Sequence, residues 1–274
     1  MEDYRAVNKA NWDERAPAHA ASPGYALDRF LDDPQFLSDV VSFDVPLLGD
    51  ISGVRGVHLQ CHIGTDTISL ARLGARMTGL DFSGVAVSEA RRLAERVGAE
   101  VDFVESDVYD AVSVLGAEQF DLVFTGIGAI GWLPSIERWA QTVAGLLKPG
   151  GRLFIREGHP MLWTIDETQT GSLTPAYSYF ETEEPMVWTA DGTYVETDHE
   201  FVHNTTHEWN HGLGEIVTAV LGAGMELTGL VEHTSVPWEA LPGQMVRTGD
   251  GKEWALAEKP ERMPLTYTLQ ARKR

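Results

Sequence analysis

The central part of the chain alternates short apolar runs with longer amphipathic stretches that are rich in alanine. Apolar runs of about four to eight residues predict buried strands, and stretches with a helical period predict helices. The predicted strands are 57–61, 76–80, 101–104, 120–125 and 152–156, and the predicted helices are 65–73, 85–97 and 135–147. This alternation indicates crossover connections and a parallel sheet with helices on its faces.

The segments on either side of this region have a different pattern. Residues 1–50 mix acidic, basic and aromatic side chains with four prolines, so we expect short helices that form an N-terminal cap. Residues 158–211 lose the regular spacing and gather aromatic side chains, and Asp191-Gly192 predicts a hairpin turn between 186–188 and 194–195. A long irregular segment is typical of a functional site, so we expect an inserted lid.

A helix over 213–221 and strands over 226–232 and 265–271 restore the regular pattern. The sequence therefore predicts an α/β fold with a doubly wound, seven-stranded, mostly parallel sheet. Residues 1–50 form the N-terminal helical cap, 51–157 and 212–274 the core, and 158–211 the lid. No repeat of fixed period and no second independent domain is indicated.

The composition is that of a folded, acidic protein. Its 274 residues are 43% hydrophobic and carry 41 acidic against 21 basic side chains, a formal net charge of −20. Because sequence-independent binding to nucleic acid relies on clustered Lys and Arg, we expect no nucleic-acid partner. No apolar run approaches the roughly 20 residues that span a bilayer, and the N-terminus lacks the order of a secretory signal. We therefore expect a cytoplasmic protein without a membrane partner.

Cysteine and metal chemistry is restricted by the same composition. Cys61 is the only cysteine, which excludes an intrachain disulfide and a thiolate zinc cluster. It falls at a predicted strand end, where a cysteine is more often a small buried apolar residue than a nucleophile. No Gly-x-Ser-x-Gly elbow occurs, so a serine nucleophile is not indicated either.

Candidate binding residues follow three of the predicted strands. The first strand continues through 60–64 directly into a helix, and such a turn exposes unpaired amides that attract carboxylate or phosphate. Asp81 ends the second strand, 17 residues after Gly64, near the spacing at which a carboxylate takes ribose hydroxyls. Asp107 follows the third strand, in position for an adenine amine. Two acids at consecutive strand ends after such a loop indicate an adenosine site.

The order of these segments resembles the class I S-adenosylmethionine-dependent methyltransferases. The resemblance covers 55–157 and is carried by the loop to Gly64, Leu80-Asp81-Phe82-Ser83, Asp107-Val108, 120–124 and 146–153. It implies a Rossmann-like fold with S-adenosylmethionine as cofactor, the ribose diol on Asp81, the adenine amine on Asp107 and the methionine part on 60–64. By the same resemblance, Ser83 and Val108 border the cofactor, and Thr125 lies beside the methyl group.

The glycine loop departs from the pattern of that family. Gln60 and His62 stand at the first two of three positions that are usually glycine, and only Gly64 remains. Because a side chain with Cβ resists positive φ, we expect a less strained loop or a cofactor slightly farther away. Gln60 is expected to donate an amide hydrogen bond to the methionine carboxylate. His58 replaces the acid that is often found at its position.

The N-terminal residues Trp12 and Arg15 resemble a segment that folds over the cofactor in small-molecule members of the family. Arg15 is expected to clamp the methionine carboxylate, and the face of Trp12 suits a sulfonium cation. The alternative is a surface helix that one tryptophan packs against the core.

Candidate catalytic residues follow the fifth strand and lie in the lid. His159 is the first candidate for a general base, and His207 or His211 at the rim of the same cleft is the second. The alternative for His159 is a hydrogen bond to a turn carbonyl. The remaining candidates bind the acceptor: Glu157 and Trp132 line its pocket, and Tyr4, Trp163 and Trp209 close it.

Other chemistries remain as alternatives. His207-Glu208-Trp209-Asn210-His211 matches the zinc hydrolase motif, but Gly212 and Gly214 follow it, so we do not expect it mid-helix and predict no metal. His199, His203, His207 and His211 recur every four residues, a spacing that indicates a polar pocket wall rather than a metal site. A nicotinamide or flavin dinucleotide fits Asp81, but the Gly-x-Gly-x-x-Gly run is absent.

The sequence thus predicts an S-adenosylmethionine-dependent methyltransferase that acts on an N, O or C nucleophile of a small molecule, as a monomer or homodimer. Methyl transfer is a direct displacement that requires alignment and exclusion of water, which a lid over the strand ends provides. The alternatives are intramolecular attack on the cofactor without methyl transfer, a dinucleotide oxidoreductase, and a binding module without turnover.

Overall fold

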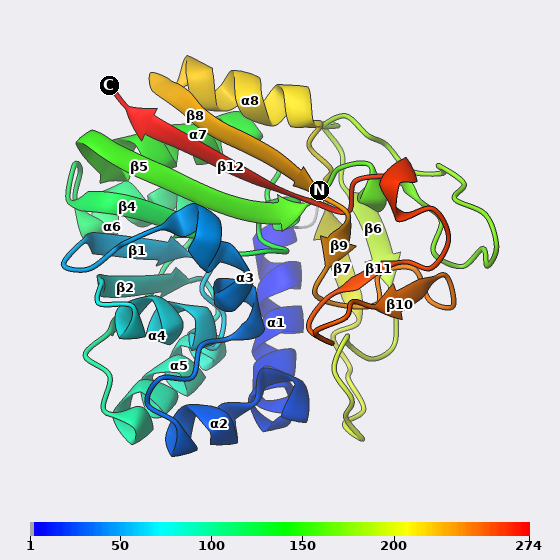
Figure 1. Cartoon of the computed structure of the whole chain (residues 1–274), viewed down its shortest axis with the longest axis horizontal. Coiled ribbons are helices and arrows are strands. Elements are labelled where there is room, and N and C mark those ends of the chain that lie inside the picture. The colour runs from blue at the N-terminus through cyan, green and yellow to red at the C-terminus, as the bar shows by residue number, and fades with distance from the viewer. Residues whose placement is uncertain (1–2) are drawn as a thin grey trace.

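The computed structural model describes residues 3–274, built around one large sheet. Its seven strands lie in the order β3-β2-β1-β4-β5-β12-β8. The first five pair in parallel, while β12 pairs antiparallel with both β5 and β8. This confirms the predicted doubly wound, mostly parallel sheet. Figure 1 shows the strands side by side, with helices on both faces.

Among the described residues, the helices are α1 (Tyr4–Ala21), α2 (Leu27–Asp32), α3 (Asp39–Leu48), α4 (Thr65–Arg72), α5 (Gly84–Val97), α6 (Ala111–Leu115), α7 (Ile136–Leu146) and α8 (Leu213–Gly222). The strands of the large sheet are β1 (Arg55–Leu59), β2 (Arg76–Asp81), β3 (Asp102–Glu105), β4 (Phe120–Thr125), β5 (Leu147–Gly158), β8 (Met225–His233) and β12 (Thr266–Lys273). The smaller sheets contain β6 (Met186–Thr189), β7 (Thr205–Glu208), β9 (Ser235–Val236), β10 (Met245–Arg247) and β11 (Trp254–Leu256).

The alternation of side chains along the strands produces two cores, one on each face of the sheet. Val123 and Ile155 face one way and pack with buried residues of α7 and α8. Phe124 and Phe154 face the other way, stacked on each other with ring centroids 5.6 Å apart, among residues of α3 and α4. Because both faces are covered, the strands read as almost continuous apolar runs. The predicted strands and crossover helices of this region are thereby confirmed to within a few residues.

Three expectations about secondary structure are corrected. Pro17 was expected to interrupt the N-terminal helices, but it lies inside the single 18-residue helix α1. Lys148-Pro149-Gly150-Gly151 is a stop signal for the predicted helix 135–147, and α7 does end at Leu146, but these four residues belong to the first part of β5 and not to a separate turn. The Asp191-Gly192 pair does not join two short adjacent strands, because β6 pairs with β7, with Met186 opposite Glu208. The Asp-Gly signal reflects only neighbouring residues, whereas the strand that pairs with β6 is β7, further along the chain.

The lid and the region before β12 form a lobe beside the large sheet. Leu162 and Ile165 pack in one hydrophobic cluster with Val236, Leu241 and other buried residues up to Leu265. This cluster includes the three-stranded sheet β10-β11-β9, which was assigned to the core and not expected as a separate unit. Figure 1 shows this lobe on the opposite side of α1 from β1 and β2.

A buried set of charged residues lies between α3, β5 and this lobe. Arg156 is fully buried and pairs with Glu253 through Nη2 and Oε2, 2.7 Å apart. Its guanidinium lies 3.6 Å from the centre of the Phe43 ring. Asp44 is also fully buried, and neither carboxylate oxygen has a hydrogen-bond partner among residues 3–274. Burial raises the pKa of Asp44 to about 8, although the charge of Arg156 opposes the shift.

Wild type is expected to lose stability against unfolding as pH rises, because Asp44 resists ionisation in the folded state. Asp44→Asn is expected to remove this loss. The folded-state pKa is about 8 and the ordinary value 3.8. The free energy of unfolding should therefore fall as pH rises between these values, by about 1.4 kcal/mol per pH unit at most. Urea unfolding from pH 4 to pH 9 should show wild type and variant converging at low pH, with the variant more stable at high pH. The exposed Asp28→Asn serves as control, and a difference that does not change with pH would contradict the assignment.

Candidate functional site

The site lies where the order of the parallel strands reverses. The chain passes from β1 outward to β2 and β3, then returns to add β4 on the other side of β1. Ligands of open α/β sheets bind beyond the carboxyl ends of the strands at this reversal point. Leu59, the last residue of β1, pairs with Leu80 on one side and Thr125 on the other. The residues after β1, β2 and β4 therefore meet at one edge.

The loop after β1 keeps a left-handed backbone although two of its residues have side chains. The φ angles are +57° at Gln60, +50° at His62 and +80° at Gly64. The expectation of a less strained loop is therefore wrong. Left-handed residues with a Cβ cost of the order of 1 kcal/mol each, and they persist where surrounding contacts hold them. The contacts of the His62 amide and ring supply such a hold.

Gly64 ends the loop in a position that admits only glycine. A Cβ there would lie 2.7 Å from Cζ of Phe103 and 2.8 Å from Cβ of Ala90. Gly64 caps α4, and its conformation lets Phe103 of β3 and Ala90 of α5 pack close beneath the loop. Its first role in the structure is thus close packing.

Asp81 is fixed by backbone amides at the end of β2. Its Oδ2 accepts a hydrogen bond from the His62 N–H at 2.8 Å, and its Oδ1 accepts one from the Ser83 N–H at 2.9 Å. The residue is 6% exposed. Burial raises the pKa of Asp81 to about 6, opposed by the two amides and by the charge of Lys9. Each carboxylate oxygen can accept a further bond, so the group can still bind a diol.

Ser83 connects Asp81 to helix α1. Its hydroxyl caps α5 by accepting a bond from the Ala86 N–H and donates to Asp13 Oδ1 at 2.6 Å. Lys9 donates to the Phe82 carbonyl at 2.7 Å and to Glu105 at the end of β3. Polar residues of α1 therefore lie directly against the ends of β2 and β3.

Asp107 lies at the end of the same edge, beyond β3. Its Oδ1 accepts a bond from the Tyr109 N–H at 2.8 Å, and its Oδ2 lies 3.8 Å from Nη1 of Arg5. The charge of Asp107 contributes, after burial, to raising the pKa of Tyr4 to about 12. Tyr4 in turn packs edge-on against Trp209, with ring centroids 5.2 Å apart. Tyr4 and Trp209 thus lie toward the expected adenine end, whereas they were expected at the acceptor pocket; that role stays a prediction.

Val108 contributes to the core beneath Asp107. Its side chain is 4% exposed and packs with Leu59 and Leu80. A side-chain contact with the cofactor is therefore not visible, and its predicted role stays a prediction.

Two buried polar atoms without partners lie at the ends of β1 and β4. Gln60 donates its amide to the Ala129 carbonyl at 2.7 Å, but its Oε1 has no partner in the described part of the chain. Thr125 is fully buried, and its Oγ1 is likewise unpaired. Buried polar atoms normally find a partner. Gln60 Oε1 can accept a hydrogen bond from an ammonium group, and the Thr125 hydroxyl can either donate or accept one. The two groups therefore fit the aminoacyl part of S-adenosylmethionine.

Helix α1 covers this edge of the sheet with an aromatic and histidine cluster. His62 Nε2 lies 2.8 Å from His19 Nδ1, and His19 Nε2 lies 2.7 Å from Thr193 Oγ1 of the lid. The ring of Trp12 lies edge-on to His62 at 5.0 Å and to Trp132 at 5.2 Å. Burial lowers the pKa of His19 to about 4 and that of His62 well below its ordinary value. The structure thus brings Trp12 and His62, which were predicted at the cofactor end, together with Trp132, which was predicted in the acceptor pocket.

Arg15 has a different set of partners from the one expected. It is 5% exposed and donates to the carbonyls of Gly192 and His203 and to the side chain of Asn204. All three are lid residues, so the guanidinium holds the lid to α1. A bond to the methionine carboxylate would require an exchange of these partners and stays a prediction.

Sequence reasoning missed most of the polar face of α1. Asn8, Asn11, Arg15 and His19 are all buried. Asn8 bonds both the carbonyl and the N–H of His207, and Asn11 bonds the carbonyl of His203. The spacing of three and four residues was a detectable signal of one helical face. It was overlooked because a buried helical face is usually recognised by apolar residues.

Glu157 shapes the loop after β4 and does not line an open pocket. It is 2% exposed, and its two oxygens accept bonds from four backbone amides: those of Gly128, Ala129, Ile130 and Gly158. Burial raises the pKa of Glu157, and the four amides oppose that shift. Loop 126–131 follows the end of β4, so Glu157 positions the backbone there. Its predicted contact with an acceptor stays a prediction.

His159 has a hydrogen bond at Nδ1 and a carboxylate beside Nε2. Nδ1 accepts a bond from the Met161 N–H at 3.1 Å, and Nε2 lies 2.9 Å from Oε1 of Glu232. Burial lowers the pKa of His159, opposed by Glu232. The ring therefore bonds the turn after β5, but its partner is the Met161 N–H and not the turn carbonyl of the alternative. Proton transfer by His159 stays a prediction that needs release of one partner.

The histidines of the lid do not form a metal site. His207 lies in β7, while His211 bonds Glu181 Oε2 at 2.8 Å and the Ile130 carbonyl at 3.1 Å. The zinc hydrolase motif therefore lies on a strand and the loop after it. Across residues 3–274, no group of three His, Cys, Asp or Glu side chains is arranged to hold a metal ion.

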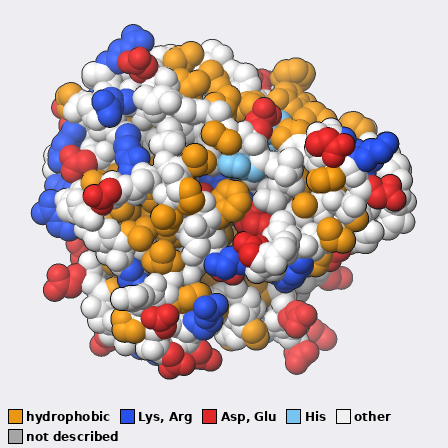
Figure 2. Space-filling view, viewed as in Figure 1, with side chains coloured by type: hydrophobic (Ala, Val, Ile, Leu, Met, Phe, Trp, Pro, Cys, Tyr) orange, Lys and Arg blue, Asp and Glu red, His pale blue; other side chains and the backbone are white. Residues whose placement is uncertain are grey.

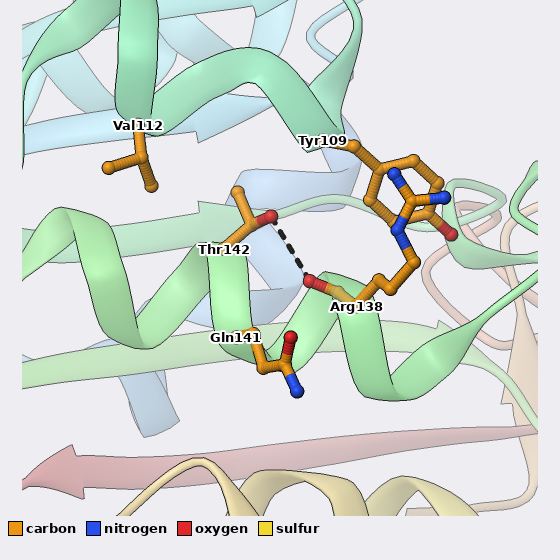
Figure 3. A pocket seen from close by; sticks show the side chains of 5 residues that line it. All are labelled: Tyr109, Val112, Arg138, Gln141 and Thr142. Atoms are coloured by element: carbon orange, nitrogen blue, oxygen red, sulfur yellow. Dashed lines mark hydrogen bonds between the residues drawn. The ribbon is translucent and has the colours of Figure 1, made fainter.

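Trp163 lies away from the histidine cluster, in the lobe. It stacks on Trp238 with ring centroids 5.8 Å apart and covers Gly158 at the end of β5. A separate hollow lies on the outer side of α6 and α7, lined by Tyr109, Val112, Arg138, Gln141 and Thr142. Figure 3 shows Arg138 over the Tyr109 ring, and none of the predicted site residues lines this hollow.

Glu157→Gln is expected to loosen loop 126–131. A Gln side chain places an amide NH2 against backbone N–H donors, so at least one bond is lost, at a cost of about 1–3 kcal/mol. Hydrogen exchange should accelerate at Gly128, Ala129 and Ile130, and the midpoint of thermal unfolding should fall. The exposed Glu137→Gln on α7 is the matched control. Unchanged exchange at these three amides would contradict the positioning role.

Comparison with known proteins finds similarity in the part of the chain that holds this site. A family model described as "Methyltransferase domain" matches residues 57–153. A ubiquinone biosynthesis O-methyltransferase of Methylobacterium sp. (strain 4-46) is 28% identical over 69% of this chain and 68% of that protein. The corresponding enzyme of Xanthomonas euvesicatoria pv. vesicatoria is 35% identical over 39% of this chain and 44% of that protein. The alignment thus spans less than half the length of this second relative.

A solved structure agrees with the sequence relatives at the level of the fold. The S-adenosylmethionine-dependent methyltransferase from Mesorhizobium loti superposes with a TM-score of 0.55 at 19% identity, covering 83% of this chain and 94% of that one. The matched stretch 57–153 contains the left-handed loop, Asp81, Asp107 and Thr125. Residues 57–153 therefore match a methyltransferase domain, and the chain has the fold of an S-adenosylmethionine-dependent methyltransferase.

Proposed function

We propose that the protein transfers the methyl group of S-adenosylmethionine to a nucleophilic atom of a small molecule. The observation that carries the proposal is the fixed carboxylate of Asp81, held at the end of β2 by the amides of His62 and Ser83. Its two oxygens have remaining lone pairs for the two hydroxyls of a ribose. The position agrees with the ribose contact that the family resemblance implies.

The rest of the cofactor then follows the edge of the sheet in both directions. Toward β3, the adenine is bordered by Asp107 and covered by Tyr4 and Trp209. Toward β1 and β4, the methionine part meets Gln60 Oε1 and Thr125 Oγ1, which are buried without partners among the described residues. The bound cofactor supplies an electrophilic methyl group, and α1 with the lid excludes water from it.

We infer an oxygen nucleophile as the first choice of acceptor. This choice rests on the two O-methyltransferases to which the chain is similar, with nitrogen and carbon nucleophiles as the other candidates. The lid and the 235–263 lobe, which are expected to enclose the body of the acceptor, lie outside the matched stretch. Specificity is therefore expected to reside in those two segments.

A small-molecule acceptor also agrees with the surface of the protein. On the face drawn in Figure 2, basic side chains are interspersed with acidic ones and do not merge into a continuous patch. A net charge of −20 disfavours a polyanionic substrate. No helix among the described residues is long and apolar enough to cross a membrane. The cytoplasmic location, and the choice between monomer and homodimer, stay predictions.

Asp81→Ala is expected to weaken binding of S-adenosylhomocysteine at least tenfold. The variant loses two hydrogen bonds to a charged group, each worth about 1.5–3 kcal/mol when formed. In wild type, affinity should fall as pH is lowered through about 6, where the carboxylate takes up a proton. Isothermal titration calorimetry from pH 5 to pH 8 measures both effects. Asp121→Asn, at the opposite end of the sheet in β4, is the control, and equal affinity of Asp81→Ala would remove Asp81 from the site.

Methyl transfer is expected to be detectable with simple probes. Wild type is incubated with methyl-labelled S-adenosylmethionine and catechol or phenethylamine, and label in the extracted product is counted. Transfer to catechol would support an oxygen acceptor, and transfer to phenethylamine alone would reassign it to nitrogen. Tight binding of S-adenosylhomocysteine without transfer to any nucleophile tested, including extracted metabolites, would favour the binding-module alternative.

A further inference from the structure

Two titratable side chains converge on one point beside Gly126, the residue that follows β4. A Cβ built on Gly126 would lie 3.3 Å from Nε2 of His58 and 3.5 Å from Oδ2 of Asp66. His58 comes from β1 and is 3% exposed, whereas Asp66 comes from the first turn of α4 and is partly buried. We call this point, bordered by Gly126, His58 and Asp66, the Gly126 notch.

The notch lies at the reversal point of the strand order. Gly126 directly follows Thr125, which pairs with the last residue of β1. With the ribose held by Asp81 at the end of β2, the sulfur end of the cofactor must extend toward β1 and β4. Thr125 Oγ1, fully buried and without a partner in residues 3–274, lies at the same strand end. If the cofactor binds as proposed, the notch lies at the same edge of the sheet as its sulfur end.

The surroundings of the notch favour proton acceptance by Asp66. Burial raises the pKa of its carboxyl, while a hydrogen bond with Ser38 and the charge of Arg156 oppose the rise. A general base works best when its pKa approaches the working pH. Asp44 on α3 is the further acid on this side, and its pKa of about 8 keeps it mostly neutral at pH 7. Burial raises the pKa values of Tyr25 and Tyr194, and the charge of Asp66 adds to the rise.

His58 is held in a fixed orientation beside Asp66. Its Nδ1 lies 2.9 Å from the Thr67 hydroxyl, which leaves Nε2 for the notch. Burial lowers the pKa of His58 to about 3, so the ring is neutral at pH 7. A neutral imidazole can accept or donate one hydrogen bond through Nε2, according to its tautomer.

We propose that the Gly126 notch receives the nucleophilic heteroatom of the acceptor, with Asp66 as its proton acceptor and His58 as its orienting partner. The inference rests on the proposed function and narrows the acceptor to one with an O–H or N–H at the reacting atom. The heteroatom lone pair forms the new bond to the methyl carbon while the carbon–sulfur bond breaks and its electron pair stays on sulfur. The O–H or N–H proton passes to the Asp66 carboxylate, so charge and atoms balance.

The test uses binding and needs no known acceptor. Sinefungin is a cofactor analogue in which an amine-bearing carbon replaces the methylated sulfur, so its ammonium group lies near the position of the methyl. Wild type should bind sinefungin about tenfold more tightly than S-adenosylhomocysteine at pH 7, because a carboxylate pairs with the ammonium. Asp66→Asn should lose this preference and keep its affinity for S-adenosylhomocysteine within about twofold. Calorimetry measures both dissociation constants.

Two further variants test whether the preference for sinefungin comes from a direct contact in the notch or from a general change in the protein. Gly126→Ala places a methyl group in the notch and should also lose the preference for sinefungin. Asp44→Asn, which removes a group that is mostly neutral at pH 7 and does not border the notch, should keep it. Thermal unfolding checks that each variant is folded.

Each remaining outcome overturns the inference in a recognisable way. Failure of wild type to bind S-adenosylhomocysteine refutes the proposed function and the inference with it. Binding without a preference for sinefungin, or a preference that survives both Asp66→Asn and Gly126→Ala, refutes the notch alone. Equal weakening of both ligands by Asp66→Asn would make Asp66 a support of the loop rather than a base.

Discussion

The structure of the site depends on one buried carboxylate that two backbone amides hold at a strand end. Asp81 accepts bonds from the N–H groups of His62 and Ser83, so its position fixes the loop after β1 and the start of α5 together. The His62 amide reaches it from a left-handed backbone, and the strain of about 1 kcal/mol is held by the surrounding contacts. Burial raises the pKa of Asp81 and the two amides oppose that rise, so they favour the charged form that binds a diol.

The polar edge of the sheet around Asp81 needs a cover that can bond polar groups. Helix α1 covers it with a polar buried face in which Asn8, Asn11, Arg15 and His19 bond lid residues. Hydrogen bonds are directional and exchangeable, so a cover built from them can release and re-form around a ligand at lower cost than a packed apolar face. Figure 1 shows α1 between the large sheet and the lobe.

The fold was predictable from the sequence, but the site only in part. The strands around Leu59, Leu80 and Phe124 and the helices between them follow from local hydrophobic pattern, and the acids Asp81 and Asp107 follow from their place after strands. The pairing of β6 with β7, and the small sheet of β9, β10 and β11, did not follow, since both depend on partners distant in the chain. His58 and Asp66 stand in no recognisable motif, and only the close approach of β1, α4 and Gly126 shows that they face one point.

The sequence by itself thus determined which segments are strands and helices, the order in which they follow, and which acids end the strands, because these properties depend on residues within a few positions of each other. The tertiary structure alone decided the direction of each functional side chain: Arg15 toward the lid, Glu157 toward four amides, and His159 toward Glu232. These directions are set by hydrogen-bond partners that lie far away in the chain. No local pattern of apolar and polar residues encodes such contacts.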